Sequence, residues 1–86
     1  MPEISRFFGI IIRMYFDDHE PPHLHAIYGE SEAQVTINPI GLLHGGLPGR
    51  AFSMVVEWTA LHQRELMDNW YRLRNNQSAQ KVAPLQ

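Results

Sequence analysis

The residues best suited to chemistry in this chain are histidines that gather behind two acidic residues. His19, His23 and His25 are three of the five histidines, and they lie within seven residues, directly after Asp17 and Asp18. Histidine titrates near neutral pH and is the most common metal ligand in proteins. A rigid Pro-Pro pair separates the first of these histidines from the other two. The sequence therefore predicts a functional site in this segment.

Two of the histidines are expected to share one face of a strand. Residues two apart in a strand project to the same side, so His23 and His25 point together. In residues 8–16 the even positions are all apolar. This alternation predicts a long strand with its even face on the core and with Arg13 and Tyr15 on the opposite face.

Antiparallel pairing extends the argument to a shared polar surface. Directly opposed residues lie on the same face, and a register with Tyr15 opposite His23 and Arg13 opposite His25 satisfies both strands. The alternating segment that follows adds two polar residues to this face. The predicted patch, on the open side of the sheet, comprises Arg13, Tyr15, His23, His25, Gln34 and Thr36, rimmed by Asp17, Asp18 and His19.

The first hypothesis for this patch is a metal site. His19, His23 and His25 with Asp18 could supply nitrogen and oxygen ligands to a divalent metal, namely Zn, Ni or Fe. His19 must then fold back over the Pro-Pro pair. A purely structural alternative is that the histidines form hydrogen bonds with Asp17, Asp18 and the backbone and so brace the loop.

Two further hypotheses use the same face. As a metal-free ribonuclease-like toxin, the chain would use one of His23 and His25 as base and the other as acid on a phosphodiester, with Arg13 and Tyr15 completing the catalytic group. As a binding module, it would present Tyr15, His23 and His25 as partly exposed anchors for a protein. The residues alone do not decide whether the chain is an enzyme.

The composition narrows these alternatives. The chain has 86 residues, a formal net charge of −2, seven Lys and Arg residues and no cysteine. A broad surface for RNA or DNA needs more basic residues than this, so RNA is not the favoured partner. The longest apolar run, residues 7–12, is too short to span a bilayer, and no signal peptide is recognisable. We therefore expect a cytoplasmic protein with no membrane contact.

The patterning predicts a single α+β domain over residues 1–86. A three- to four-stranded antiparallel β meander is expected in the strand-rich residues 1–46. Apolar residues recur at helical spacing over residues 47–76 and slip at residues 62–65, which predicts one long kinked helix or two helices meeting there. Residues 77–86 form an extended tail. A short sheet covered by helices on one side favours a homodimer.

Four segments of the chain resemble the domain-of-unknown-function 4160 family of short bacterial proteins, over essentially the full length. They are the segments Pro2–Ile10, Asp18–Ala26 with its Pro-Pro-His-x-His element, Tyr28–Glu30 and Glu57–Trp70. The resemblance implies a cytoplasmic protein often encoded beside a small protein of the domain-of-unknown-function 2442 family. We therefore expect a protein-binding component of a two-gene, toxin–antitoxin-like module.

Overall fold

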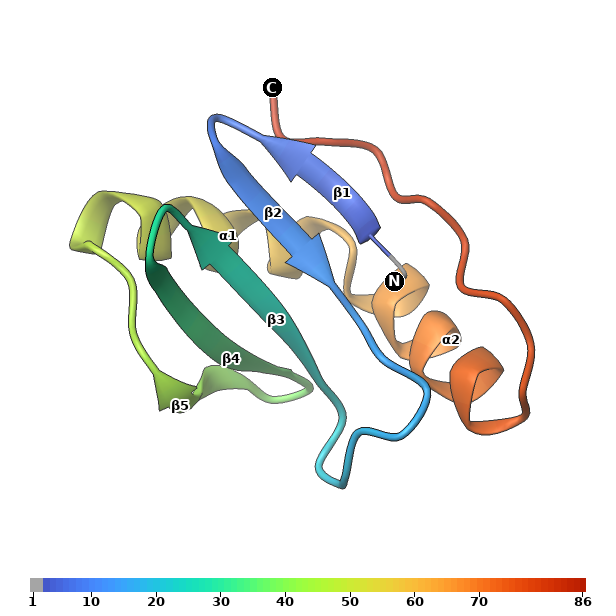
Figure 1. Cartoon of the computed structure of the whole chain (residues 1–86). Coiled ribbons are helices and arrows are strands. Elements are labelled where there is room, and N and C mark those ends of the chain that lie inside the picture. The colour runs from blue at the N-terminus through green and yellow to red at the C-terminus, as the bar shows by residue number, and fades with distance from the viewer. Residues whose placement is uncertain (1–2) are drawn as a thin grey trace.

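Alternating apolar residues in the first half of the chain and helically spaced ones in the second produce an α+β fold (Figure 1). The computed structural model describes residues 3–86, which form five strands followed by two helices. The strands are β1 (Glu3–Phe7), β2 (Ile10–Arg13), β3 (His23–Tyr28), β4 (Ser31–Ile37) and β5 (Ile40–Gly45), and the helices are α1 (Gly49–Leu61) and α2 (Gln63–Arg74).

The sheet is an antiparallel meander in which each strand pairs with its neighbour in sequence, in the order β1-β2-β3-β4-β5. Our expectation of three or four strands was wrong, because the long strand expected over residues 8–16 does not form. Phe8 and Gly9 both have positive φ, at 49° and 81°, and make a tight turn between β1 and β2. Ile10, Ile12 and Met14 are buried as expected, whereas Phe8 and Phe16 are exposed.

The register between the strands follows the predicted parity. Arg13 of β2 lies opposite His25 of β3, and Gln34 of β4 lies opposite His25 from the other side. Thr36 lies opposite His23. Tyr15 lies beyond the end of β2 and has no strand partner, so the predicted pairing of Tyr15 with His23 does not occur.

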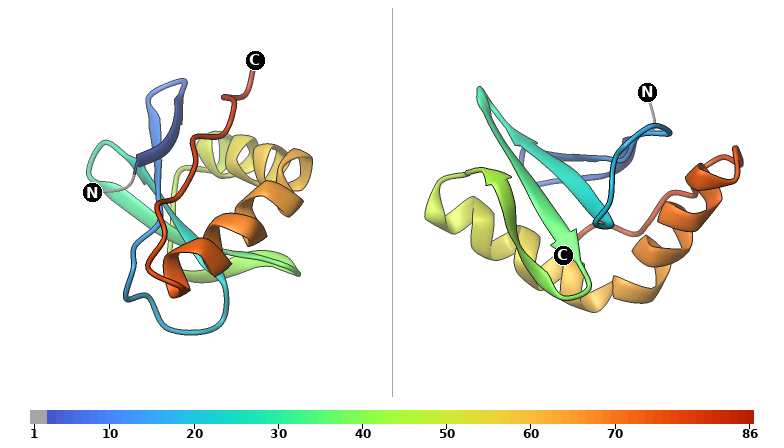
Figure 2. Two further views of the ribbon diagram at one scale, coloured as in Figure 1. Left: turned by 90° about the vertical axis from the view of Figure 1, so that its right-hand side faces the viewer. Right: turned by 90° about the horizontal axis from the view of Figure 1, so that it is seen from below.

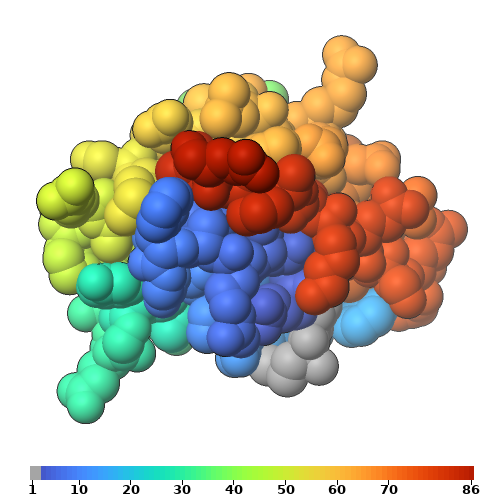
Figure 3. Space-filling view, turned by 90° about the horizontal axis from the view of Figure 1, so that it is seen from above, coloured from blue at the N-terminus to red at the C-terminus, as the bar shows by residue number. Residues whose placement is uncertain are grey.

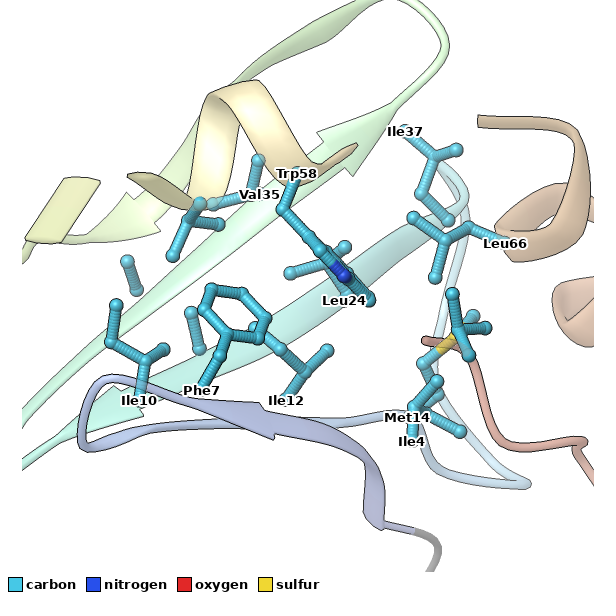
Figure 4. Packing of buried hydrophobic residues seen from close by; sticks show 14 of the residues in the cluster. Ile4, Phe7, Ile10, Ile12, Met14, Leu24, Val35, Ile37, Trp58 and Leu66 are labelled. Carbon is cyan, nitrogen blue, oxygen red and sulfur yellow. The ribbon is translucent and has the colours of Figure 1, made fainter. Parts of the chain in front are cut away.

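The two helices pack on the core face of the sheet and meet at His62 (Figures 1 and 2). Of the two alternatives that the sequence left open, two helices meeting within residues 62–65 is therefore the correct one. Gln63, at this junction, donates a side-chain hydrogen bond to the carbonyl of Ile37 at the end of β4 (2.7 Å). In the core, the rings of Phe7 and Trp58 lie 5.3 Å apart, and Leu24 and Leu66 pack in the same cluster (Figure 4). No helix of residues 3–86 is long and apolar enough to cross a membrane.

The C-terminal segment lies along the outer side of β1 (Figures 1 and 3). The backbone N–H of Val82 donates to the carbonyl of Ile4 (3.0 Å), and the indole N–H of Trp58 donates to the carbonyl of Ala83 (2.8 Å). The buried amide of Asn69 bonds both backbone groups of Gln80, each at 2.8 Å. Helix α2 thus holds the tail against the sheet edge.

We predict that Asn69→Ala lowers the free energy of unfolding by about 2 kcal/mol, because it leaves the N–H and carbonyl of Gln80 without their partner. Asn69→Asp keeps the acceptor and loses the donor, so its free energy of unfolding should lie between those of Asn69→Ala and the unsubstituted chain. Urea denaturation measures both. Tyr71→Ala, an exposed change on the same helix, is the control. An Asn69→Ala protein as stable as the control would show that the two hydrogen bonds between Asn69 and Gln80 contribute nothing to stability.

Candidate functional site

Three of the residues singled out from the sequence meet where β3 begins. Asp18 lies in the loop between β2 and β3, which runs past α2 before the chain enters the sheet (Figure 1). His23 and His25 are the first and third residues of β3. One carboxylate oxygen of Asp18 and one ring nitrogen of each histidine all lie within 4.8 Å of one another. We call Asp18, His23 and His25 the Asp–His cluster.

The hydrogen bonds of the cluster define which ring nitrogens carry protons. Nδ1 of His23 lies 2.8 Å from the carbonyl of Pro21, and Nδ1 of His25 lies 2.9 Å from a carboxylate oxygen of Glu32. A carbonyl or carboxylate oxygen only accepts, so each Nδ1 carries the hydrogen and donates it. In the neutral imidazole the other nitrogen, Nε2, then bears a lone pair.

Both Nε2 atoms face the same carboxylate. Nε2 of His25 lies 3.1 Å from Oδ2 of Asp18, and Nε2 of His23 lies 3.7 Å from that oxygen. With neutral rings, three electron-pair donors converge on one point. Such an arrangement needs a cation among them, either a second proton on an imidazole or a metal ion.

The cluster is buried, which corrects our expectation of an open sheet face with partly exposed histidine anchors. His23 is 4% and His25 is 7% exposed. The Trp70 ring of α2 lies 5.5 Å from the His23 ring, and Tyr15 meets the His25 ring edge-on at 4.7 Å. The end of α2 and the β2–β3 loop therefore bury two rings that the sequence analysis expected to be partly exposed.

Helix α2 also fixes the loop that carries the carboxylate. The Arg74 guanidinium donates to the backbone carbonyl of Asp18 (2.9 Å) and lies 3.8 Å from the carboxylate of Glu20. It also sits 5.5 Å from the centre of the Trp70 ring, a cation–π distance. The end of α2 thus holds Asp18 in place through its backbone.

The structure sorts the residues that the sequence proposed. Asp18, His23 and His25 come together, whereas His19 is exposed and lies outside the cluster. Arg13 and Tyr15 both lie next to His25, one by strand register and the other by ring contact. Two contacts agree with the bracing hypothesis: Nδ1 of His23 donates to the carbonyl of Pro21, and Nε2 of His25 lies 3.1 Å from the carboxylate of Asp18.

Sequence reasoning missed two partners of the cluster. Glu32 has the same parity as Gln34 and Thr36, so the alternation that placed those two could also have placed it. Trp70 is one of the apolar residues that recur at helical spacing over residues 47–76. It is buried, but its contact with His23 depends on how α2 docks, which no local pattern records.

A small surface pocket lies between α2 and the tail. Three of the side chains that line it are already engaged: Glu65 with His62, Asp68 with Arg72 at 3.5 Å, and Asn69 with Gln80. It contains no histidine, so the Asp–His cluster is the candidate site.

Comparison with known proteins gives one match. The family model described as "Domain of unknown function (DUF4160)" matches residues 9–71, which include every residue of the cluster. No curated protein and no solved structure matches the chain.

We predict that His23→Ala lowers the free energy of unfolding by about 2–4 kcal/mol, since it removes a buried ring packed on Trp70 and frees the carbonyl of Pro21. His23→Asn can keep the bond to Pro21 and should lose less. Chemical denaturation without added metal tests both variants. The exposed His19→Ala should change stability by under about 0.5 kcal/mol. Equal stability of the His19 and His23 alanine variants would contradict the packing described above.

Proposed function

The chain belongs to the family described as DUF4160, and we propose that this member binds a first-row divalent metal ion through Asp18, His23 and His25. The proposal rests on the orientation of the two histidines: Nδ1 of each ring is held by an acceptor, and Nε2 of each ring faces the Asp18 carboxylate. Metal-binding histidines almost always donate their other N–H in this way to a carbonyl or carboxylate, which fixes the ring and its tautomer.

The donor set supports the choice of metal. Two imidazole nitrogens and one carboxylate oxygen suit Zn, Ni or Fe, and they disfavour Mg or Ca, which prefer oxygen ligands. Three protein ligands also leave at least one coordination position for water or another ligand. His19, our fourth ligand from the sequence, is not needed in this proposal.

Charge supports the same proposal. His25 lies between two carboxylates, those of Asp18 and Glu32, at 3.1 and 2.9 Å. Bringing two carboxylates to one nearly buried ring is costly unless a cation compensates them. A dication held by the cluster would offset this negative charge.

We predict that the metal-free protein binds one Co²⁺ or Zn²⁺ per chain, and that Asp18→Asn or His25→Ala weakens the affinity at least about 100-fold, because each removes one of three ligands. Isothermal titration calorimetry measures the affinity, and Co²⁺ absorption reports the ligands. The matched control is His19→Ala, which should bind metal as the unsubstituted chain does. If only the His19 variant failed to bind metal, or if the unsubstituted chain also failed to bind it, the proposed site would be refuted.

We propose further that the chain is the cytoplasmic, protein-binding component of a two-gene, toxin–antitoxin-like module, with a partner of the domain-of-unknown-function 2442 type. The observation that favours it is β5, the last strand of the sheet, where Leu42 and Leu43 are 53% and 41% exposed. Exposed apolar residues on an edge strand are typical of a strand-pairing surface. The partner surface proposed here is therefore β5. His23 and His25 are too buried to serve as anchors for a protein, and the same burial disfavours the access of an RNA strand that the ribonuclease hypothesis requires.

We predict that Leu43→Lys weakens co-purification with that partner, or self-association in its absence, at least about tenfold, because it places a charge in an apolar contact. Leu61→Lys introduces the same charge at another exposed leucine, at the end of α1, and should have no effect. Size-exclusion chromatography with light scattering separates the two cases. Equal binding by both variants would remove β5 from the interface.

A further inference from the structure

Arg13 is a charged residue on the His25 face of the sheet. It occupies the last position of β2, opposite Glu3 of β1 on one side and His25 of β3 on the other. Its Nε is buried and has no hydrogen-bond partner among residues 3–86. A guanidinium nitrogen withdrawn from water without an acceptor is costly, and this cost is relieved when an acceptor arrives.

The neighbouring carboxylate is already taken. Both oxygens of Glu3 accept hydrogen bonds from Arg6, at 2.9 and 3.1 Å. This hydrogen bonding lowers the pKa of the Glu3 carboxyl below its ordinary value, so Glu3 is held ionised by Arg6. Arg13 adds only a longer-range attraction and forms no ion pair with Glu3 within 4 Å.

On its other side, Arg13 pairs in register with His25, a ligand of the proposed metal. Asp18 and Glu32 bring two negative charges to His25, and Arg13 brings one positive charge to the neighbouring strand. With neutral rings and no metal, the charges of these three side chains sum to −1, and a divalent ion brings the sum to +1. The loaded site therefore attracts an anion more strongly than the empty site does.

We propose that the metal ion of the cluster and Arg13 together bind the phosphate group of a small ligand; this rests on the proposed metal-binding function. Phosphate has enough oxygens to coordinate the metal with one and to accept hydrogen bonds from the guanidinium with others, a pairing to which the planar arginine fork is suited. Gln34, opposite His25 on β4, and Tyr15, against the His25 ring, add polar groups from the same face.

The test uses the full chain loaded with Co²⁺ or Zn²⁺ in a buffer free of phosphate. Inorganic phosphate is titrated by calorimetry, and the Co²⁺ spectrum reports whether the ligand enters the metal's coordination sphere. Parallel titrations with phenyl phosphate and dimethyl phosphate distinguish free phosphate from a monoester or a diester as the preferred source. We expect binding to the loaded protein, and binding at least about tenfold weaker to the metal-free protein.

Two arginine variants separate the role of Arg13 from general charge. Arg13→Gln should retain metal affinity and lose phosphate affinity at least about tenfold. Arg50→Gln, the same change at an exposed arginine of α1, should bind both as before. Arg6→Gln leaves Arg13 intact but frees Glu3 to pair with it, so it should also weaken phosphate binding.

The two proposals fail in distinguishable ways. Metal binding without phosphate binding overturns the anion proposal and leaves the metal site standing. Phosphate binding that is unchanged by metal removal, or by Arg13→Gln, also overturns it. Absence of metal binding removes both.

Discussion

The arrangement of this protein depends on how two imidazole rings are buried at the end of its sheet. Each ring nitrogen withdrawn from water needs a partner, and the chain supplies these from three places: the Pro-Pro turn through Pro21, the loop through Asp18, and strand β4 through Glu32. Helix α2 adds Trp70, which covers the His23 ring. Satisfying the rings therefore fixes the loop, the start of β3 and the docking of α2 at once. The candidate site and the fold are built from the same contacts.

Helix α2 shows this dual use along its own length. Leu66, Trp70 and Leu73 are buried in the apolar core, and Trp70 also contacts the His23 ring. Arg74, one turn after Trp70, donates to the carbonyl of Asp18 in the loop. Asn69 holds the tail. One helix thus carries a core face, a site face and a tail contact, so its position couples the stability of the domain to the geometry of the cluster. This coupling explains why a small chain can keep nearly buried polar rings in a defined orientation.

The sequence predicted the parts of this arrangement that depend on strand periodicity. The predicted register correctly placed Arg13 opposite His25, and the parity of β4 correctly placed Gln34 on the same face. It failed at Phe8, because alternation of apolar residues cannot reveal that this residue adopts a positive φ and starts a turn. It also failed to foresee the burial of His23, since Trp70 reaches that ring from 47 positions further along the chain. Local pattern gave the register, and tertiary docking decided which face is covered.

The tail gives the sheet two unlike edges. One backbone hydrogen bond from Val82 to Ile4, with the side chain of Val82 buried, occupies the outer side of β1, whereas β5 has no strand on its outer side within residues 3–86. Strand-to-strand growth of a fibril requires two open edges on every copy. A copy with one blocked edge can join a single neighbour through β5 and then stops the row. Because the tail covers the outer edge of β1, edge-to-edge assembly of this chain through β5 would stop at a closed pair.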